Sequence, residues 1–181
     1  MSFSIFSKKS QGQKIMDLID SSVNEFINHP AKKPHTVVEA KVLLITVVFT
    51  TLSDKYARSQ NVNTLTNELL TLLEVSLSDS EKQIILKNYD NIRQFFKQRF
   101  DVFFEMDPML ALQQERGQIP SLTCTCLFSD PLGPLSAVQF ENGKRSYSSN
   151  NLYMNLPLII KFVDTYFEAK SKFIKKLEPL I

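Results

Sequence analysis

The sequence predicts an α+β fold that is predominantly α-helical: a helical bundle around a central apolar helix (36–58), a small three-stranded antiparallel sheet (about 121–148) and a closing C-terminal helix. Three observations lead to this prediction. Residues 42–52 carry no charge, which is typical of a helix covered by neighbours. Several other segments repeat apolar residues at helical spacing, and one segment alternates with a period of two before an Asn-Gly turn.

Length and composition indicate one domain. The chain has 181 residues, of which 43% are hydrophobic, enough for a core without disulfides or metal. We expect residues 1–10 to form a flexible N-terminal arm and 11–181 a single globular domain. The formal net charge of +2 does not favour nucleic acid as a partner. Residues 42–52 are too short for the about 20 residues of a transmembrane helix. With two closely spaced cysteines and no expected secretory signal, the cytoplasm is the predicted location.

The first two helices follow from apolar spacing and proline. Apolar residues recur at helical spacing over 11–28, which predicts an amphipathic first helix. Pro30 and Pro34 end it, because residues before proline avoid the helical region. Thr36 and Glu39 have the spacing of a capping box, so we expect them to open the central helix and to satisfy its first amide groups.

The middle of the chain predicts three further helices. Leucines at helical spacing indicate a helix over 64–77. Ser78 and Glu81 form a second capping-box pattern, followed by a seam of Ile, Tyr and Phe that predicts one continuous helix to about Met106. An Asp-Pro start and a glycine end then predict a short helix over 108–116.

The period of the pattern changes after residue 120. Residues 121–128 alternate Leu122, Cys124, Cys126 and Phe128 with threonines, which predicts a strand. The Asn-Gly dipeptide at 142–143 is a strong hairpin signal. A hairpin folded about that dipeptide places apolar side chains on one face, with Val138 opposite Tyr147 and Phe140 opposite Arg145.

The last helix is predicted from about Leu156 to Leu177, with Asn155 as its N-cap and proline in its first turn. Its apolar spacing predicts a buried side that consists of Ile159, Phe162, Val163, Tyr166, Phe167, Phe173, Ile174 and Leu177. Its second half is rich in lysine, a charge that complements the helix dipole. Acidic residues are interleaved with these lysines, so we do not expect this helix to bind nucleic acid.

The sequence predicts no catalytic residue, no metal site and no cofactor. Cys124 and Cys126 are expected to face the core, and His29 and His35 to lie in a solvated loop without a nearby nucleophile. Four glycines provide no phosphate-binding loop. Two acidic pairs one helical turn apart are expected on solvated faces: Asp17 with Asp20, and Asp101 with Glu105.

The leading functional hypothesis is therefore a non-catalytic protein–protein interaction module, such as an adaptor, a chaperone-like subunit or an inhibitor. It would bind another protein or a second copy of itself through an apolar surface of its helices, with Phe167 and Phe173 at an exposed part of the last helix. A second hypothesis is a carrier or sensor of a small apolar ligand. A third is an enzyme of unrecognised type that uses Cys124 or Cys126. The candidate binding residues are Phe162, Tyr166, Phe167, Phe173, Phe140 and Tyr147.

Overall fold

The computed structural model describes residues 9–55, 60–104, 118–138, 146–149 and 153–181. Most of the predicted N-terminal arm, the predicted short helix 108–116 and the Asn-Gly turn lie outside these residues. The described part is predominantly helical, as the sequence predicts.

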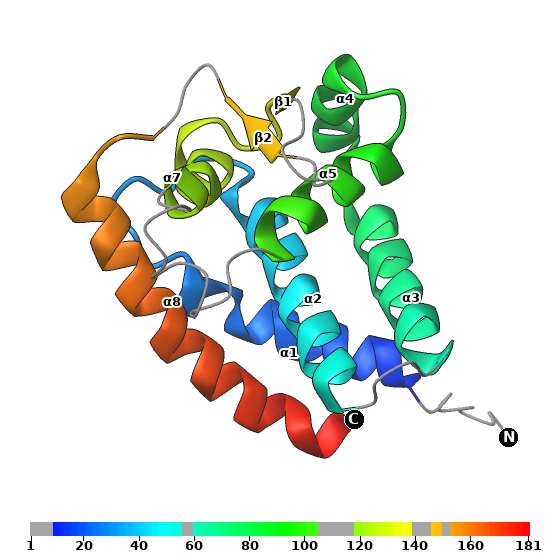
Figure 1. Ribbon diagram of the computed structural model, residues 1–181. Helices are drawn as coiled ribbons and strands as arrows, with labels where there is room; N and C mark the ends of the chain where they lie inside the picture. Colours follow the sequence, from blue (N-terminus) through cyan, green and yellow to red (C-terminus); the bar gives the residue numbers. More distant parts are fainter. Residues whose placement is uncertain (1–8, 56–59, 105–117, 139–145, 150–152) are drawn as a thin grey trace, which may run out of the picture.

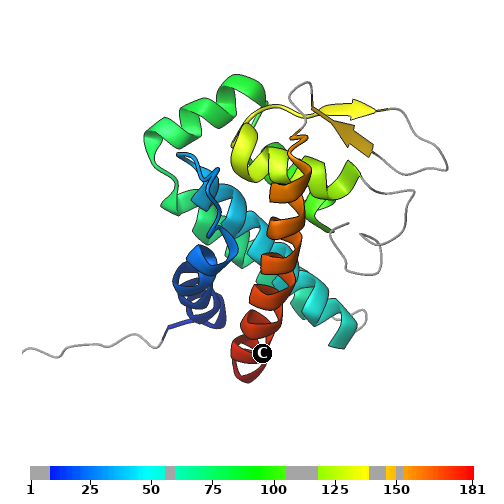
Figure 2. The same ribbon diagram turned by 90° about the vertical axis from the view of Figure 1, so that its left-hand side faces the viewer.

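The apolar helix α2 (Thr36–Lys55) lies at the centre of the molecule (Figures 1 and 2). Its apolar residues cover most of its circumference, so it is buried by neighbours on several sides. Four helices pack against it: α1 (Gln11–Phe26), α3 (Gln60–Ser76), α5 (Ile92–Phe104) and α8 (Leu156–Leu177). The predicted central position of this segment is confirmed.

Two of the N-terminal caps follow local sequence signals. Ser10 and Gln13 form a capping box that opens α1. Ser78 and Glu81 form the predicted capping box that opens α4 (Asp79–Asn88). In each case a side chain satisfies an amide that has no partner within the helix, so the start of the helix is encoded within four residues.

The capping box predicted for Thr36 and Glu39 is wrong. Thr36 already belongs to the helix, and its hydroxyl accepts from the Lys33 amide and donates to the Leu127 carbonyl at 2.6 Å. Glu39 is buried and turned toward Arg99. The tertiary partners of these two side chains replace the local bonds that their spacing suggests.

The long helix predicted to run to Met106 is two helices, α4 and α5. Tyr89 has extended backbone angles (φ −135°, ψ 147°) and ends α4. The Asn91 side chain accepts from the Gln94 amide at 2.8 Å, and the Gln94 side chain accepts from the Asp90 amide at 2.8 Å. Polar side chains that compete for backbone groups thus interrupt a seam that is periodic in apolar residues.

The predicted strand 121–128 is also wrong, because this segment is helical. It comprises α7 (Gln118–Cys124) followed by a π-helical turn, η2 (Thr125–Ser129). All side chains from Leu122 to Phe128 are buried, including those of the threonines. The Thr125 hydroxyl donates to the Ser121 carbonyl, so this buried hydroxyl has a hydrogen-bond partner within the helix. Complete burial removes the difference between inner and outer faces on which the alternation argument depends.

Two short strands remain of the predicted sheet, beside α7 and α5 (Figures 1 and 2). The strands β1 (Ser136–Val138) and β2 (Ser146–Ser148) are antiparallel, and Tyr147 lies opposite Ala137 rather than Val138. The predicted register is therefore wrong by one residue. Short, serine-rich strands carry little apolar pattern that could define a register. Phe140 lies outside the described residues.

The last helix has the predicted bounds. The Asn155 side chain accepts from the Leu158 amide, and proline occupies the first turn of α8. One face of α8 is buried against the bundle through a regularly spaced set: Ile159, Phe162, Tyr166, Ala169, Phe173 and Leu177. This face closes the core on the side opposite α3 (Figure 1).

Candidate functional site

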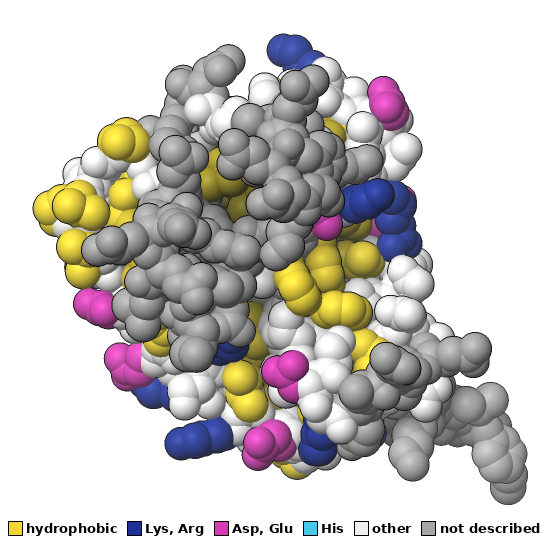
Figure 3. Space-filling model, viewed as in Figure 1, with side chains coloured by type: hydrophobic (Ala, Val, Ile, Leu, Met, Phe, Trp, Pro, Cys, Tyr) yellow, Lys and Arg dark blue, Asp and Glu magenta, His cyan; other side chains and the backbone are white. Residues whose placement is uncertain are grey.

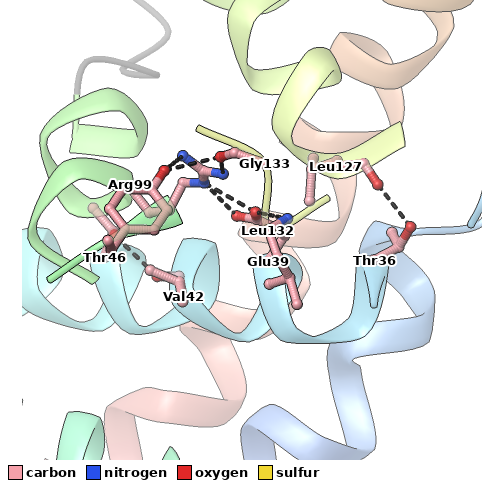
Figure 4. Close-up of polar contacts among 9 residues, drawn as sticks. Thr36, Glu39, Val42, Thr46, Arg99, Leu127, Leu132 and Gly133 are labelled. Atoms are coloured by element: carbon pink, nitrogen blue, oxygen red, sulfur yellow. Dashed lines mark hydrogen bonds and ion pairs between the residues drawn. The ribbon is translucent and has the colours of Figure 1, made fainter. Parts of the chain in front are cut away.

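The described residue cluster richest in chemical groups surrounds a buried ion pair between Glu39 of α2 and Arg99 of α5 (Figure 4). Both side chains are 0% exposed. Arg99 Nε donates to both carboxylate oxygens of Glu39 at 2.9 Å. The Leu132 amide donates to Glu39 Oε1 at 2.8 Å. A buried charge is tolerated in a protein only when it is paired and hydrogen-bonded, and both conditions are met here.

The remaining donors of Arg99 bind neighbouring oxygens. Nη1 donates to the Tyr89 hydroxyl at 3.1 Å, and Nη2 donates to the Gly133 carbonyl at 2.6 Å. The Tyr89 hydroxyl in turn donates to the same carbonyl at 2.9 Å. The guanidinium also lies 4.9 Å from the centre of the Phe95 ring. The network therefore joins α2, the junction of α4 and α5, and the loop after η2.

The segment after α7 is held by further polar contacts. Lys33 Nζ donates to the Ser129 carbonyl at 2.7 Å, and the Tyr153 amide donates to Thr125 Oγ1 at 2.7 Å. Leu132 has a positive φ of 64°, a backbone conformation that costs free energy in a residue with a side chain. Its amide is thereby directed at Glu39. The ion pair holds this strained loop in place.

The electrostatics of the pair match a structural role. Burial raises the pKa of the Glu39 carboxyl, whereas the positive charge of Arg99 and the Leu132 amide oppose that shift. Neither charged group is exposed, so neither can exchange a proton directly with a bound substrate. The arrangement stabilises the fold and provides no accessible acid or base.

Cys124 and Cys126 are free thiols buried in the core. Burial raises the pKa of Cys126 to about 12 and that of Cys124 well above its ordinary value. Both remain protonated at neutral pH, whereas a nucleophilic cysteine requires a thiolate. Their burial agrees with the sequence-based expectation that they face the core, although the element that carries them is a helix.

The two histidines do not share a solvated loop, and the prediction is wrong for His29. Its side chain is 8% exposed and stacks on the Phe128 ring, with 4.2 Å between the ring centres. Its Nε2 lies 3.2 Å from the Leu158 carbonyl, and its Nδ1 accepts from the Ala31 amide at 3.2 Å. These contacts suit the neutral ring, and burial lowers the pKa of His29. His35 has different neighbours from His29: its Nδ1 lies 3.5 Å from Glu81 Oε1.

The acidic pairs considered in the sequence have basic or hydroxyl neighbours. Asp17 pairs with Lys9 at 2.6 Å, and Asp20 pairs with Lys41 at 2.7 Å. Asp101 accepts from the Tyr147 hydroxyl at 2.9 Å. Glu105 lies outside the described residues. Within the described ranges, no three His, Cys, Asp or Glu side chains are grouped so that they could hold a metal ion.

The candidate binding residues divide between core and surface. Phe162, Tyr166 and Phe173 are buried, and the last two form edge-to-face contacts with Phe26. The burial of Phe173 agrees with the buried side predicted from apolar spacing, and its placement at an exposed part of the last helix is wrong. Phe167 and Tyr147 are partly exposed and pack against the edge of the core. The three buried residues lie on the face of α8 that contacts the bundle.

The start of α8 carries an apolar surface that was not predicted from the sequence. Met154, Leu156 and Ile160 are 74%, 63% and 53% exposed. Apolar side chains gather at this end of α8 on the left edge of the molecule in Figure 3. Leu156 and Ile160 lie one helical turn apart, away from the buried face. Their spacing relative to that face could have identified them, because they fall about a third of a turn from its centre.

Comparisons with known proteins provide no relative for this chain: no protein family, no curated protein and no solved structure matches it. Helix α2 is the only described helix with the length and composition of a membrane span, and 67% of its apolar window is buried inside the protein. That burial is characteristic of a core helix.

Proposed function

We propose that this protein is a non-catalytic interaction module of the cytoplasm that binds another polypeptide through an apolar surface at the start of α8. The observation that carries the proposal is the concentration of exposed apolar side chains there. Three of the six strongly exposed large apolar side chains of the described residues lie in this one stretch: Met154, Leu156 and Ile160. Contiguous exposed apolar surface commonly marks an interaction site.

The chemistry of the interior supports the same proposal. The buried Glu39–Arg99 pair is fully engaged in holding the loop after η2. The two thiols are buried and protonated, which argues against an enzyme that uses Cys124 or Cys126. Free thiols also suit a reducing compartment such as the cytoplasm.

A small apolar ligand is the second candidate. A surface depression of about 500 Å³ lies along the second half of α8, with Phe167 and Ile174 among its lining residues. Its volume falls within the range of sites that bind small molecules. It is less enclosed than such sites usually are, because its described lining comes from α8 and from Glu178, the residue after it.

Native mass spectrometry of gently purified protein tests both candidates. We expect the wild-type protein to carry a stoichiometric polypeptide, and the double variant Leu156→Lys/Ile160→Lys to lose it while keeping its circular dichroism spectrum. The matched control is Val75→Lys/Leu86→Lys, which changes two exposed apolar residues elsewhere. Retention of the polypeptide by the α8 variant would refute the assigned surface. An added mass of a few hundred daltons would instead establish the ligand carrier.

A further inference from the structure

Helix α8 presents a second stripe beside its buried face. It consists of Leu156, Ile160, Val163, Phe167, Ser171 and Ile174, and Glu178 continues the row directly after the end of the helix. These positions are separated by four, three, four, four, three and four residues, which places them in one row along a helix of 3.6 residues per turn. The row is about 33 Å long at 1.5 Å per residue. We call it the α8 stripe.

The surface is hollowed where the α8 stripe is interrupted by a small residue. Ser171 is exposed and lies between Phe167 and Ile174, and all three line the depression of about 500 Å³. A side chain projecting from a partner helix fits such a hole, as ridges fit into grooves when helices pack. The apolar surface at the start of α8 continues into this depression along the same row.

Positive charge flanks the depression on both sides. Lys170 and Lys175 also line it, and a helical turn of about 100° per residue places them on opposite flanks of the row that contains Ser171 and Ile174. Lys170 Nζ lies 6.0 Å from the centre of the Tyr166 ring, on the flank nearer the core. One carboxylate, Glu178, closes the far end. Two further exposed carboxylates, Asp164 and Glu168, lie on the same flank of α8 as Lys175 but do not line the depression, and Glu168 pairs with Lys172 at 2.6 Å. An apolar floor between two lysines complements an apolar partner surface bordered by acidic residues.

We propose that the α8 stripe binds an amphipathic helix of a partner protein, which inserts an apolar side chain at Ser171 and places acidic residues opposite Lys170 and Lys175. This inference rests on the proposed function and specifies its partner. Recognition follows the packing of two helices against each other, in which apolar side chains spaced by three and four residues on the partner contact the apolar row of α8. The lysines select among amphipathic helices, whereas the apolar row supplies most of the binding free energy.

Two synthetic 22-residue helical peptides test the inference by fluorescence anisotropy. Both carry leucine at helical spacing; one has glutamate along both flanks of the leucines, and the other has lysine there. We expect the glutamate peptide to bind about tenfold more tightly at low salt, with the ratio shrinking at high salt as exposed charges are screened. Ser171→Leu fills the depression and should weaken binding of the glutamate peptide several-fold without changing the fold, because residue 171 is exposed.

Charge reversal supplies the decisive comparison. Lys170→Glu/Lys175→Glu should invert the preference, so that the lysine peptide binds more tightly, whereas Lys87→Glu on α4 should leave it unchanged. Equal binding of the two peptides by the wild-type protein, or an unchanged preference in the reversed variant, overturns the inference.

If native mass spectrometry shows a bound polypeptide that is retained in Ser171→Leu and in the charge-reversed variant but is lost in Leu156→Lys/Ile160→Lys, the partner helix is wrong and the proposed function stands. If no polypeptide is bound in the wild type, the proposed function itself fails.

Discussion

Replacing Arg99 by methionine is the sharpest test of the buried network. The variant removes the donor to both oxygens of Glu39, and also one donor to the Gly133 carbonyl. That carbonyl keeps the Tyr89 hydroxyl as a donor, and Glu39 keeps the Leu132 amide. The main loss of stability therefore comes from the Glu39 carboxylate, which stays buried without its positively charged partner. Breaking a buried pair from one side costs about 3–5 kcal/mol of unfolding free energy.

Urea denaturation followed by circular dichroism measures this cost. With a denaturant slope of about 2 kcal/mol/M, the unfolding midpoint should fall by about 2 M. The double variant Glu39→Gln/Arg99→Met removes the charge and keeps an oxygen to accept from the Leu132 amide, so it should recover a large part of the loss. A fall of less than about 0.5 M for Arg99→Met, or a double variant no more stable than the single one, would refute the reasoning.

The same variant predicts a pH dependence. Burial raises the pKa of Glu39, and without Arg99 the main opposing interaction is gone. A group whose folded-state pKa lies above its unfolded value of about 4.3 stabilises the fold fully below that value and loses this contribution as pH rises through the folded pKa. The loss of unfolding free energy caused by Arg99→Met should therefore be smaller at pH 5 than at pH 8. The opposite trend would show that Glu39 stays ionised without its partner.

Three further predictions concern other buried groups. The pKa of His29 is lowered by burial, so the wild-type protein should lose stability as pH falls below about 6.5 toward the folded pKa, and His29→Gln should reduce this loss in thermal unfolding. Thr123→Val should raise the unfolding free energy by about 1 kcal/mol, because the buried hydroxyl has no partner among the described residues; a lower urea midpoint would contradict this. Phe173→Asp should unfold the protein, because Phe173 is buried, whereas the partly exposed Phe167→Asp should remain folded by circular dichroism.

Features that depend on neighbours within a few residues could be predicted from the sequence. Apolar spacing located α1 and α8, and Ser78 with Glu81 located the start of α4. The absence of charge from residues 42–52 predicted the central position of α2, because such a helix must be covered on most sides. The separation of α4 from α5 at residues 89–91 also has a local cause, the polar side chains of Asn91 and Gln94. It was not predicted because the apolar residues continue at helical spacing across it.

The helical state of residues 121–128 and the role of Glu39 depend on contacts between distant parts of the chain, so the sequence pattern did not predict them. Alternation of side chains indicates a strand when one face is buried and the other is solvated, but here both sides are buried and the segment is helical. Glu39 and Arg99 lie 60 residues apart, and Leu132 is 93 residues from Glu39. In the sequence, Glu39 and Arg99 each look like an ordinary charged residue on a helix. A buried charge is stable only in the presence of its partner, so the pair acquires its role when the chain brings α2, α5 and the loop after η2 together.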